Sequence, residues 1–345
     1  MLKKIFLTML LLVTFIFGGC VTQGKVEDET HVEAAQDSEG NLKISMLNIG
    51  QGDSLLIQTG KQTILVDTAR FKNHGLLVRE LEKLSVTKID KLILTHSHAD
   101  HIGGARMLIN PTQEQLTKYP YLEKISVAKV YDNGVVYTSP SYKSLMETVN
   151  EKKIERKSLK AGDTLDFGGG VKFKVLFPTK DFVEYVNSKP LDKNDKEHNI
   201  NNGSLVAKLT YKNFSMMFTG DCEKESEAKI LESYDTKDLK CDVLKAGHHG
   251  LMTSSTKKFV SAINPSCVLI SASNAEKDDV AMGAPRLKVL ENYLAAGVEK
   301  KNIFCTRFNG TITITSDGKN FSVAPEEKED WVDKWMEHKR KTQQK

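Results

Sequence analysis

The stretch LILTHSHADHIGG, from Leu92 to Gly104, is the most informative part of this chain for its fold. Its apolar start indicates a buried strand that ends at His96, and His98, Asp100 and His101 follow at once. A loop after a strand can aim neighbouring side chains at one point, because loop residues follow no fixed helical or strand period. Imidazoles and carboxylates are ligands that borderline divalent metals prefer. The stretch therefore predicts a metal site at a strand end.

Two later stretches could supply the remaining ligands. MFTGD places Asp221 after an apolar run and a glycine, and VLKAGHHG places His248 and His249 in the same situation. Functional groups of α/β proteins gather at strand ends. Taken alone, the aspartate would be read as a turn cap and the two histidines as surface residues. Their joint occurrence with the first stretch favours one shared metal site.

Composition fits a single large α/β domain rather than a strongly basic nucleic-acid binder. The chain has 345 residues, of which 27% are charged and 39% belong to the apolar set. Its net charge is +4, and without Lys3 and Lys4, which lie in a targeting segment, 47 basic residues face 45 acidic ones. A dominant electrostatic footprint for nucleic acid is not expected, although a local basic patch remains open.

The amino terminus has the layout of a lipoprotein signal. Two lysines precede the apolar run IFLTMLLLVTFIF and then GGC, which is too short for a comfortable membrane span. We expect lipidation at Cys20, with a plain signal peptide or an uncleaved anchor as alternatives. The predicted organisation is a signal peptide at 1–19, a flexible tether at 20–41, a hydrolase domain at 42–324, and an amphipathic helix or tail at 325–345.

Strand-like runs alternate with helical patterns in both halves of the chain. The first half holds apolar runs at 44–49, 54–59, 63–68 and 91–96, and the second half holds runs at 204–211, 214–221, 241–247, 267–273, 302–307 and 311–316. Helical spacing lies between them at 74–84, 222–234, 254–263 and 284–297. Two β-rich halves of this kind predict two sheets face to face, with helices outside.

The remaining cysteines and the carboxyl-terminal tail are expected to be structural. An exported chain permits disulfides, but the spacing of the four later cysteines favours buried free thiols: Cys222, Cys241, Cys267 and Cys305. The tail carries Trp331 and Trp335 at helical spacing, with acidic residues first and basic residues last. It predicts an amphipathic helix that docks on the domain.

Four segments together resemble the metallo-β-lactamase superfamily, in the branch of the ComEC-type competence-protein hydrolase domain: LNIGQGDSLLIQTGKQTILVDTA, LILTHSHADHIGG, NNGSLVAKLTYKNFSMMFTGD and DVLKAGHHG. The resemblance runs from about 42 to 323. It implies an αββα sandwich, two facing mixed β-sheets flanked by helices, with a one- or two-metal hydrolytic site. Two divalent metal ions, zinc or manganese, are the cofactors it implies.

The resemblance also implies roles for individual residues. His96 and His98 would hold the first metal, Asp100, His101 and His248 would hold the second, and Asp221 would bridge the two. Asp100 and Asp221 would orient the attacking water, and either metal-bound water or His249 would protonate the leaving group. Asp53 and Asp67 would support the ligands from behind, and turn capping is the alternative for both.

Two positions depart from the family pattern. Asn202 stands where related enzymes often carry a histidine, and it could hold metal or substrate through its carbonyl oxygen; His198 is the alternative. Ala284 stands where members of this branch carry a histidine, so either His249 takes over that role or catalysis is weak. From Asn202 we expect manganese to serve at least as well as zinc.

The expected function is an exported phosphodiesterase or nuclease that acts through metal-activated water on a phosphodiester, DNA or RNA. The alternatives are a cell-envelope phosphocholine esterase acting on teichoic acid and a catalytically weakened surface lipoprotein that only binds. We expect a monomer on the extracellular face of the bacterial membrane, held by the lipid at Cys20, with secretion as the alternative. No polytopic apolar region is seen, so no transmembrane channel is expected.

Overall fold

The computed structural model describes residues 41–189, 200–273 and 283–343. These residues all belong to one compact unit, Val32–Lys345. The predicted signal peptide with Cys20, nearly all of the tether, and His198 lie outside the described residues.

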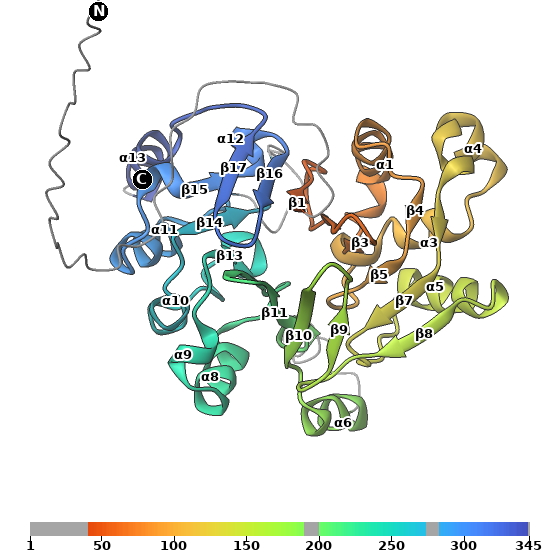
Figure 1. Ribbon diagram of the computed structural model, residues 1–345, viewed down its shortest axis with the longest axis horizontal. Helices are drawn as coiled ribbons and strands as arrows, with labels where there is room; N and C mark the ends of the chain where they lie inside the picture. Colours follow the sequence, from red (N-terminus) through yellow and green to blue (C-terminus); the bar gives the residue numbers. More distant parts are fainter. Residues whose placement is uncertain (1–40, 190–199, 274–282, 344–345) are drawn as a thin grey trace, which may run out of the picture. The chain divides into compact units, whose positions relative to one another are not determined.

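The first sheet has eight strands and contains both the first and the last strand of the described residues (Figure 1). Its order is β17-β16-β1-β2-β3-β5-β7-β8. The central strands β3 and β5 run parallel, as do β5, β7 and β8, whereas β17 to β3 pair antiparallel. The strands span β1 Leu42–Met46, β2 Leu55–Gln58, β3 Thr63–Val66, β5 Lys91–Ile93, β7 Lys129–Asp132, β8 Glu155–Ser158, β16 Ile312–Ser316 and β17 Phe321–Pro325.

The second sheet has seven strands in the order β15-β14-β13-β12-β11-β10-β9. Strands β12 to β15 are parallel, and β9 to β12 are antiparallel. They span β9 Thr164–Asp166, β10 Val171–Phe177, β11 Val206–Tyr211, β12 Phe214–Phe218, β13 Val243–Lys245, β14 Cys267–Ile270 and β15 Ile303–Cys305. A separate two-stranded sheet joins β4 Lys88–Ile89 to β6 Ser126–Val127.

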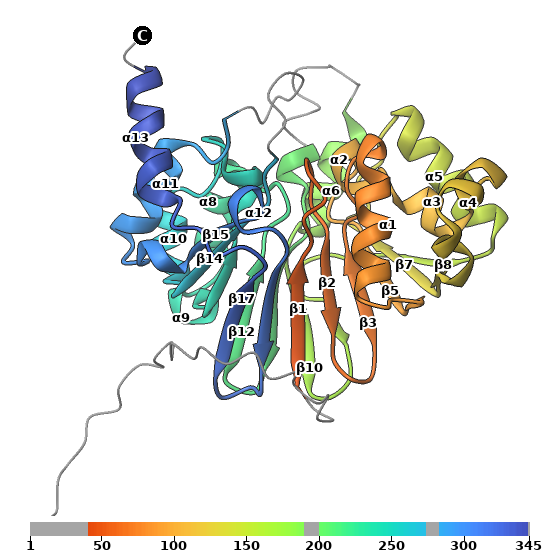
Figure 2. The ribbon, with the colours of Figure 1, turned by 90° about the horizontal axis from the view of Figure 1, so that it is seen from above.

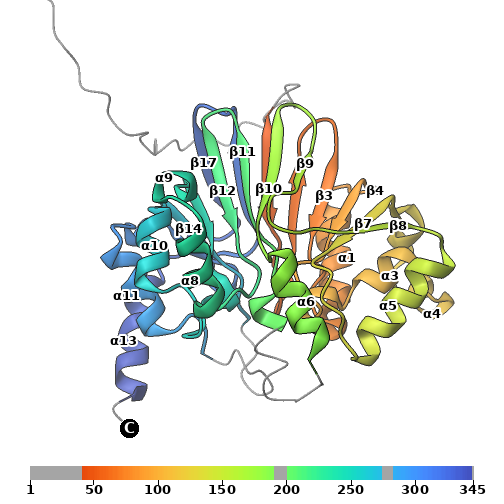
Figure 3. The same ribbon diagram turned by 90° about the horizontal axis from the view of Figure 1, so that it is seen from below.

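Helices cover the outer face of each sheet, and the two sheets face each other (Figures 2 and 3). On the first sheet lie α1 His74–Lys83, α2 Ala99–Ile102, α3 Ala105–Ile109, α4 Gln113–Lys118 and α5 Pro140–Glu151, with the 3₁₀ turns η1 Phe71–Asn73 and η2 Pro120–Lys124. The later elements are α6 Lys180–Ser188, α8 Lys224–Ser233, α9 Thr236–Leu239, η3 Gly247–Gly250, α10 Lys257–Ile263, α11 Leu287–Ala295, η4 Lys300–Asn302, α12 Thr306–Asn309 and α13 Val332–Gln343.

The layers follow from the alternation of side chains along buried strands. In β2, Leu55 and Ile57 enter the core between the sheets, whereas Leu56 enters the core beneath α1. In the second sheet, Met216 faces the other sheet and Met217 faces the helices. Successive strand residues point to opposite faces, so each strand serves two apolar layers. The predicted αββα sandwich is thereby confirmed.

The division of the chain into two halves differs from the predicted one. The run 311–316 closes the second half in sequence, yet β16 pairs with β1 of the first sheet, from Leu42 against Ser316 to Met46 against Ile312. In exchange, β9 and β10 come from the first half and join the second sheet. These placements depend on antiparallel pairing between segments that are distant in the sequence. The local apolar pattern predicts that a segment is a strand, but not which segment it pairs with.

The carboxyl-terminal helix packs on the outer face of the second sheet's helical layer. Trp331, Trp335 and Met336 are buried in the core that also contains Leu290 of α11. The Trp331 ring stacks on Phe308 with 4.7 Å between ring centroids. The Trp335 indole N–H donates to the Pro285 carbonyl oxygen at 2.8 Å.

The four described cysteines, Cys222, Cys241, Cys267 and Cys305, are buried free thiols, and burial is the main cause that raises the pKa of each. Within the described ranges, every helix is too short or too polar to cross a membrane.

Candidate metal centre

The carboxyl ends of parallel strands carry most of the predicted site residues. Asp67 follows β3 and His96 follows β5, which are parallel neighbours in the first sheet. Asp221 follows β12, and the turn Gly247–Gly250 follows β13, which are parallel neighbours in the second sheet. Parallel neighbours end at the same edge, so each sheet presents its polar residues on one side.

Four of these side chains form one compact cluster. Asp100, His101, Asp221 and His249 each place a ligand-type atom within 4.8 Å of the others. His101 Nε2 lies 3.1 Å from Asp221 Oδ2, and His249 Nε2 lies 3.3 Å from the same oxygen. His249 Nε2 is also 3.5 Å from Asp100 Oδ2. Two imidazoles and two carboxylates suit a borderline divalent cation such as zinc or manganese.

His96 and His98 form a second group beside this cluster. His96 Nε2 lies 3.1 Å from His98 Nδ1 and 3.9 Å from Asp221 Oδ2. Asp221 therefore adjoins both groups of imidazoles. This arrangement is compatible with two cations on either side of Asp221, which is the arrangement that the resemblance implies.

The two adjacent histidines lie differently from the roles that the sequence suggested. His249 is fully enclosed and belongs to the cluster, whereas the side chain of His248 is 17% exposed. His248 Nδ1 faces the Thr253 hydroxyl at 2.7 Å and the Glu223 carboxylate at 3.2 Å. Its Nε2 lies 3.8 Å from Asp221 Oδ2. The resemblance implied His248 as the ligand and His249 as the proton donor, whereas in the structure His249 Nε2, at 3.3 Å, lies closer to Asp221 Oδ2 than His248 Nε2 does.

The cause is the backbone of the turn. His248 and His249 have φ values of 44° and 55°, both in the left-handed region that few residues adopt. With two successive left-handed residues, the side chains of the turn no longer follow the simple alternation of an extended strand. Strains of this kind cluster at functional sites.

Asp67 contacts the outer ring nitrogen of His101. Its Oδ2 accepts from His101 Nδ1 at 2.7 Å and from the Thr95 hydroxyl at 2.7 Å, and its Oδ1 accepts from the Thr95 amide at 2.8 Å. A carboxylate on Nδ1 fixes the ring so that Nε2 points toward the cluster.

Asp53 belongs to a buried ion pair that sequence reasoning missed. The Lys245 ammonium contacts Asp53 Oδ2, donates to the Gly220 carbonyl oxygen at 2.9 Å, and lies 3.9 Å from Asp221 Oδ1. The side chains of Lys245 and Asp53 are each 1% exposed. Asp53 Oδ1 lies 3.4 Å from His249 Nδ1. The one available signal was a lysine inside the otherwise apolar strand DVLKAG.

The pattern of hydrogen bonds in the cluster is compatible with a bound metal ion. His101 Nε2, His249 Nε2 and Asp221 Oδ1 are buried and have no hydrogen-bond partner among the described residues. Buried polar atoms are normally paired, so such a convergence calls for another species. The outer nitrogens are occupied, because His101 Nδ1 faces Asp67 and His249 Nδ1 lies 3.2 Å from the Ser271 carbonyl oxygen. With the protons on Nδ1, both Nε2 lone pairs face the cluster.

The electrostatics of the cluster favour positive charge. Burial alone lowers the pKa of His101, but Asp221 and Asp67 outweigh it and hold this pKa well above its usual range. The pKa of His249 is raised against burial in the same way by Asp221 and Asp53. Burial would raise the pKa of Asp221, yet His101 and His249 hold it well below its usual range. A cation that binds here displaces protons from the imidazoles.

His96 differs from the other two buried imidazoles. Burial, and then the neighbouring His101 and His98, lower its pKa well below the usual range. His96 is therefore neutral near pH 7, which is the state that binds a metal.

Two further predicted positions contact neighbouring elements, Asn202 the helix α8 and the segment of Ala284 the histidine turn. Asn202 Oδ1 accepts from the Ser226 amide at 3.2 Å, and Asn202 Nδ2 donates to Glu225 at 3.3 Å, so this amide binds the first turn of α8. Its role toward a metal stays a prediction. Ala284 is buried beside the histidine turn, where the Arg286 amide donates to the Gly250 carbonyl oxygen at 2.9 Å.

Comparison with known proteins gives relatives of one kind. The sequence model of the metallo-beta-lactamase superfamily matches residues 47–178. ComE operon protein 3 of Bacillus subtilis (strain 168) is 29% identical over 308 residues, which cover 84% of this chain and 35% of that protein. Competence protein ComA of Neisseria gonorrhoeae is 24% identical over 238 residues, which cover 69% of this chain and 28% of that protein.

This chain thus spans about a third or less of the length of these curated relatives. Among solved structures, the metallo-beta-lactamase fold protein YhfI from Bacillus subtilis aligns with a TM-score of 0.47 and 12% identity over 80% of this chain and 100% of that one. The sandwich, the buried Asp/His cluster and the sequence matches agree: residues 47–178 match the metallo-beta-lactamase superfamily, and the chain has homologues in its ComEC-like branch.

Proposed function

We propose that this protein is a metal-dependent phosphodiesterase that cleaves DNA or RNA. The observation that carries the proposal is the buried cluster of Asp100, His101, Asp221 and His249, whose unpaired Nε2 and Oδ1 atoms converge. When bound at such a site, divalent cations make water a nucleophile near neutral pH and offset charge on phosphoryl oxygens. The choice of nucleic acid is supported by the names of two relatives, Competence protein ComA and Recombination protein 2 of Haemophilus influenzae, which is 28% identical over 242 residues.

The chain's own side chains would have distinct tasks in this reaction. His101 and His249 would hold a cation through Nε2, with their Nδ1 protons donated to Asp67 and to the Ser271 carbonyl oxygen. His248 is the partly exposed imidazole beside Asp221, so we assign to it, rather than to His249, the task of meeting the substrate and moving a proton to the leaving group.

The test is an activity screen on stripped protein reloaded with Zn²⁺ or Mn²⁺. Substrates are single- and double-stranded DNA, RNA, bis-p-nitrophenyl phosphate and p-nitrophenyl phosphorylcholine. We expect phosphodiester cleavage that requires metal and is lost in Asp221→Ala. Release from phosphorylcholine alone would favour the envelope esterase instead, and bound metal without turnover of any substrate would favour a binding protein.

The same proposal places the protein outside the cell on a lipid anchor. Its support is the order of lysines, apolar run and GGC that ends at Cys20. Labelled fatty acid should enter the wild-type protein in cells and should not enter Cys20→Ala. Unlipidated wild-type protein in the cytoplasm would contradict this localisation without touching the assignment of the activity.

A further inference from the structure

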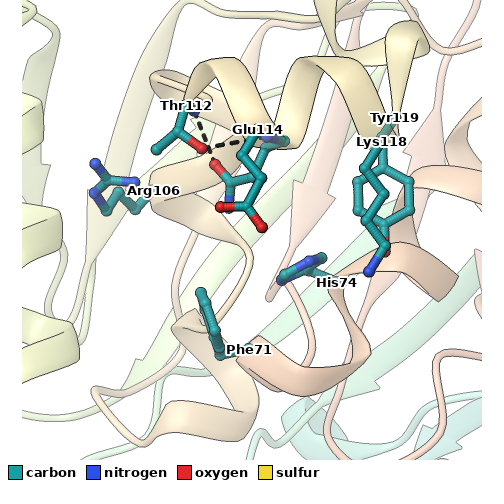
Figure 4. Close-up of a pocket in the computed structure, with 8 residues that line it drawn as sticks. Phe71, His74, Arg106, Thr112, Glu114, Lys118 and Tyr119 are labelled. Atoms are coloured by element: carbon teal, nitrogen blue, oxygen red, sulfur yellow. Dashed lines mark hydrogen bonds between the residues drawn. The ribbon is translucent and has the colours of Figure 1, made fainter.

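A cavity of about 350 Å³ opens between η1, α1 and α4, on the first-sheet side of the molecule (Figure 4). Its lining includes Phe71, His74, Arg106, Lys118 and Tyr119. None of these residues belongs to the metal cluster. The volume lies within the range of small-molecule sites.

Three aromatic rings from different elements form one wall. Phe71 and His74 meet edge to face with 5.0 Å between centroids, and His74 meets Tyr119 in the same way at 5.5 Å. Phe71 is 59% exposed, which is unusual for a phenylalanine held by ordered backbone. An exposed ring at the mouth of a cavity offers its face to another flat ring.

The polar lining of the cavity includes an imidazole and a carboxylate. His74 Nδ1 is buried and has no hydrogen-bond partner among the described residues. Burial and the nearby Lys118 lower the pKa of His74, so the ring is neutral near pH 7. The Glu114 carboxylate points toward His74 and Phe71 from α4 (Figure 4). A neutral imidazole and a carboxylate suit the edge of a nucleobase, which carries both donors and acceptors.

Positive side chains surround the aromatic wall. Arg106 and Lys118 line the cavity, and the Lys118 ammonium lies 5.4 Å from the centre of the Tyr119 ring. Arg70 and Lys72 flank Phe71 in the chain. Aromatic rings interleaved with cations are the combination by which proteins hold single-stranded nucleic acid.

The wall is tied to the metal cluster by one short loop. The Thr68 amide donates to the His101 carbonyl oxygen at 2.7 Å, and the Gly103 amide donates to Ala69 at 2.9 Å. A Cβ on Gly103 would lie 2.2 Å from the Phe71 nitrogen, so α2 and this loop are in direct contact. Since Phe71 comes four residues after Asp67, its Cα lies within about 14 Å of that of Asp67.

We propose that this cavity binds one base of a single-stranded nucleic acid whose neighbouring phosphodiester lies at the metal cluster. The base stacks on Phe71, its edge meets His74 and Glu114, and Arg106 and Lys118 take the flanking phosphates. The substrate class rests on the proposed function. A duplex is excluded from this mode, because its bases already stack on each other.

The test compares a base-bearing strand with an abasic strand of equal length and charge. Both carry phosphorothioate linkages and a fluorescent label, and both are titrated against metal-loaded protein. We expect the wild type to bind the base-bearing strand about fivefold or more tightly than the abasic strand. Phe71→Ala should bind both strands alike, and Phe71→Trp should retain the preference because it keeps a stacking face.

A matched pair of residues outside the cavity supplies the control. Lys124 lies over Tyr121 at 5.4 Å, the same distance at which Lys118 lies over Tyr119, but neither Lys124 nor Tyr121 lines the cavity. Tyr121→Ala should keep the preference for bases. Circular dichroism should show that Phe71→Ala remains folded.

The outcomes separate the two proposals. Equal binding of both strands by the wild type, or a preference that survives in Phe71→Ala, would overturn the base site whatever the activity. Hydrolysis of bis-p-nitrophenyl phosphate is measured on the same wild-type preparation. Its absence, together with base-dependent binding that Phe71→Ala abolishes, would remove the proposed function and leave the base site standing.

Discussion

Two neighbouring histidines, His248 and His249, show which part of the site geometry could not be predicted from the sequence. The pattern GHHG predicted metal chemistry at this turn, and the resemblance implied His248 rather than His249 as the ligand. Left-handed backbone at both His248 and His249 directs His249 inward. A sequence gives the chemical types of the ligands, whereas their directions in a loop depend on dihedral angles that no periodicity encodes.

The histidine assignment can be tested by metal binding alone. We expect His249→Ala to weaken metal affinity by about 100-fold or more, since loss of an outer partner typically costs 10- to 100-fold and a direct ligand costs more. His248→Ala, one residue away, should retain most of the metal. The measurement is metal content after dialysis against graded chelator. Equal retention in both variants, or greater loss in His248→Ala, would restore the assignment suggested by sequence.

The buried ion pair of Lys245 and Asp53 leads to a second prediction about single residues. Lys245→Met leaves the Asp53 carboxylate buried beside Asp221 without its cation. We expect the free energy of unfolding to fall by roughly 3–5 kcal/mol, the cost of breaking a buried pair from one side.

The double variant distinguishes this cause from simple loss of packing. Lys245→Met with Asp53→Asn removes both charges and should recover a large part of the loss. Additive losses in a denaturant-unfolding cycle would mean that the two charges do not depend on each other. Lys245 could not be assigned from sequence, because a lysine at a strand end is usually solvated.

At the scale of elements, α8 is joined to α10 by a buried carboxylate. Glu227 accepts from the amides of Ser255 and Thr256 at the start of α10. Burial raises the pKa of Glu227 to about 7, although these hydrogen bonds act to lower it. A raised pKa means that the folded state holds the proton more tightly, so this contribution to stability is full below about pH 4.5 and is lost as pH rises through about 7.

The variant Glu227→Gln should remove this slope. Between about pH 5 and pH 8, the wild type should lose up to about 3 kcal/mol relative to Glu227→Gln, at 1.4 kcal/mol per pKa unit. Urea unfolding at several pH values measures the difference. Glu232→Gln, an exposed change on the same helix, is the control and should follow the wild type. Parallel profiles for the wild type and Glu227→Gln would show that Glu227 is charged in the fold at all these pH values.

The last helix, α13, offers a test of docking. Trp331 is 2% exposed, and its indole N–H donates to the Ile303 carbonyl oxygen at 3.2 Å. Trp331→Ala should lower the free energy of unfolding by about 3–5 kcal/mol, because it removes a large buried ring. Lys334→Ala on the exposed side should change it by less than about 0.5 kcal/mol. An unchanged unfolding midpoint in Trp331→Ala would show that the domain does not need this helix.

Most individual strands could be predicted from the sequence, whereas their pairing within the sheets could not. Apolar runs bounded by turn residues predicted β1, β2, β3 and β5 and most strands of the second sheet. The edge strand β8 was missed, because all four of its residues are exposed and carry no apolar pattern. The placement of β16 beside β1 was missed as well, because register between distant segments is set by the assembled core.

At the scale of the whole molecule, the metal cluster joins the two sheets. Asp100 and His101 come from the first sheet's side, whereas Asp221 and His249 follow strands of the second. The Ser271 hydroxyl, after β14, donates to the Gly52 carbonyl oxygen, before β2, at 2.6 Å. A cation held by residues from both sides therefore binds the folded sandwich and has no comparable site in the unfolded chain.

Metal loading should therefore raise the thermal unfolding midpoint of the domain as a whole. At a free metal concentration about 100 times the dissociation constant, the gain is about 2.7 kcal/mol, which corresponds to an increase in Tm of roughly 5 °C. The gain should shrink as pH falls, because Asp221 and its neighbours raise the pKa values of His101 and His249 and the cation must displace their protons.

Asp221→Asn should lose most of the gain in Tm on metal loading, whereas Glu232→Gln should keep it. Differential scanning calorimetry with Mn²⁺ or Zn²⁺ at several pH values measures these shifts. If equilibrium dialysis shows bound metal but Tm stays constant, the ion binds outside the shared cluster, and neither the ligand assignment nor the reaction derived from it would hold.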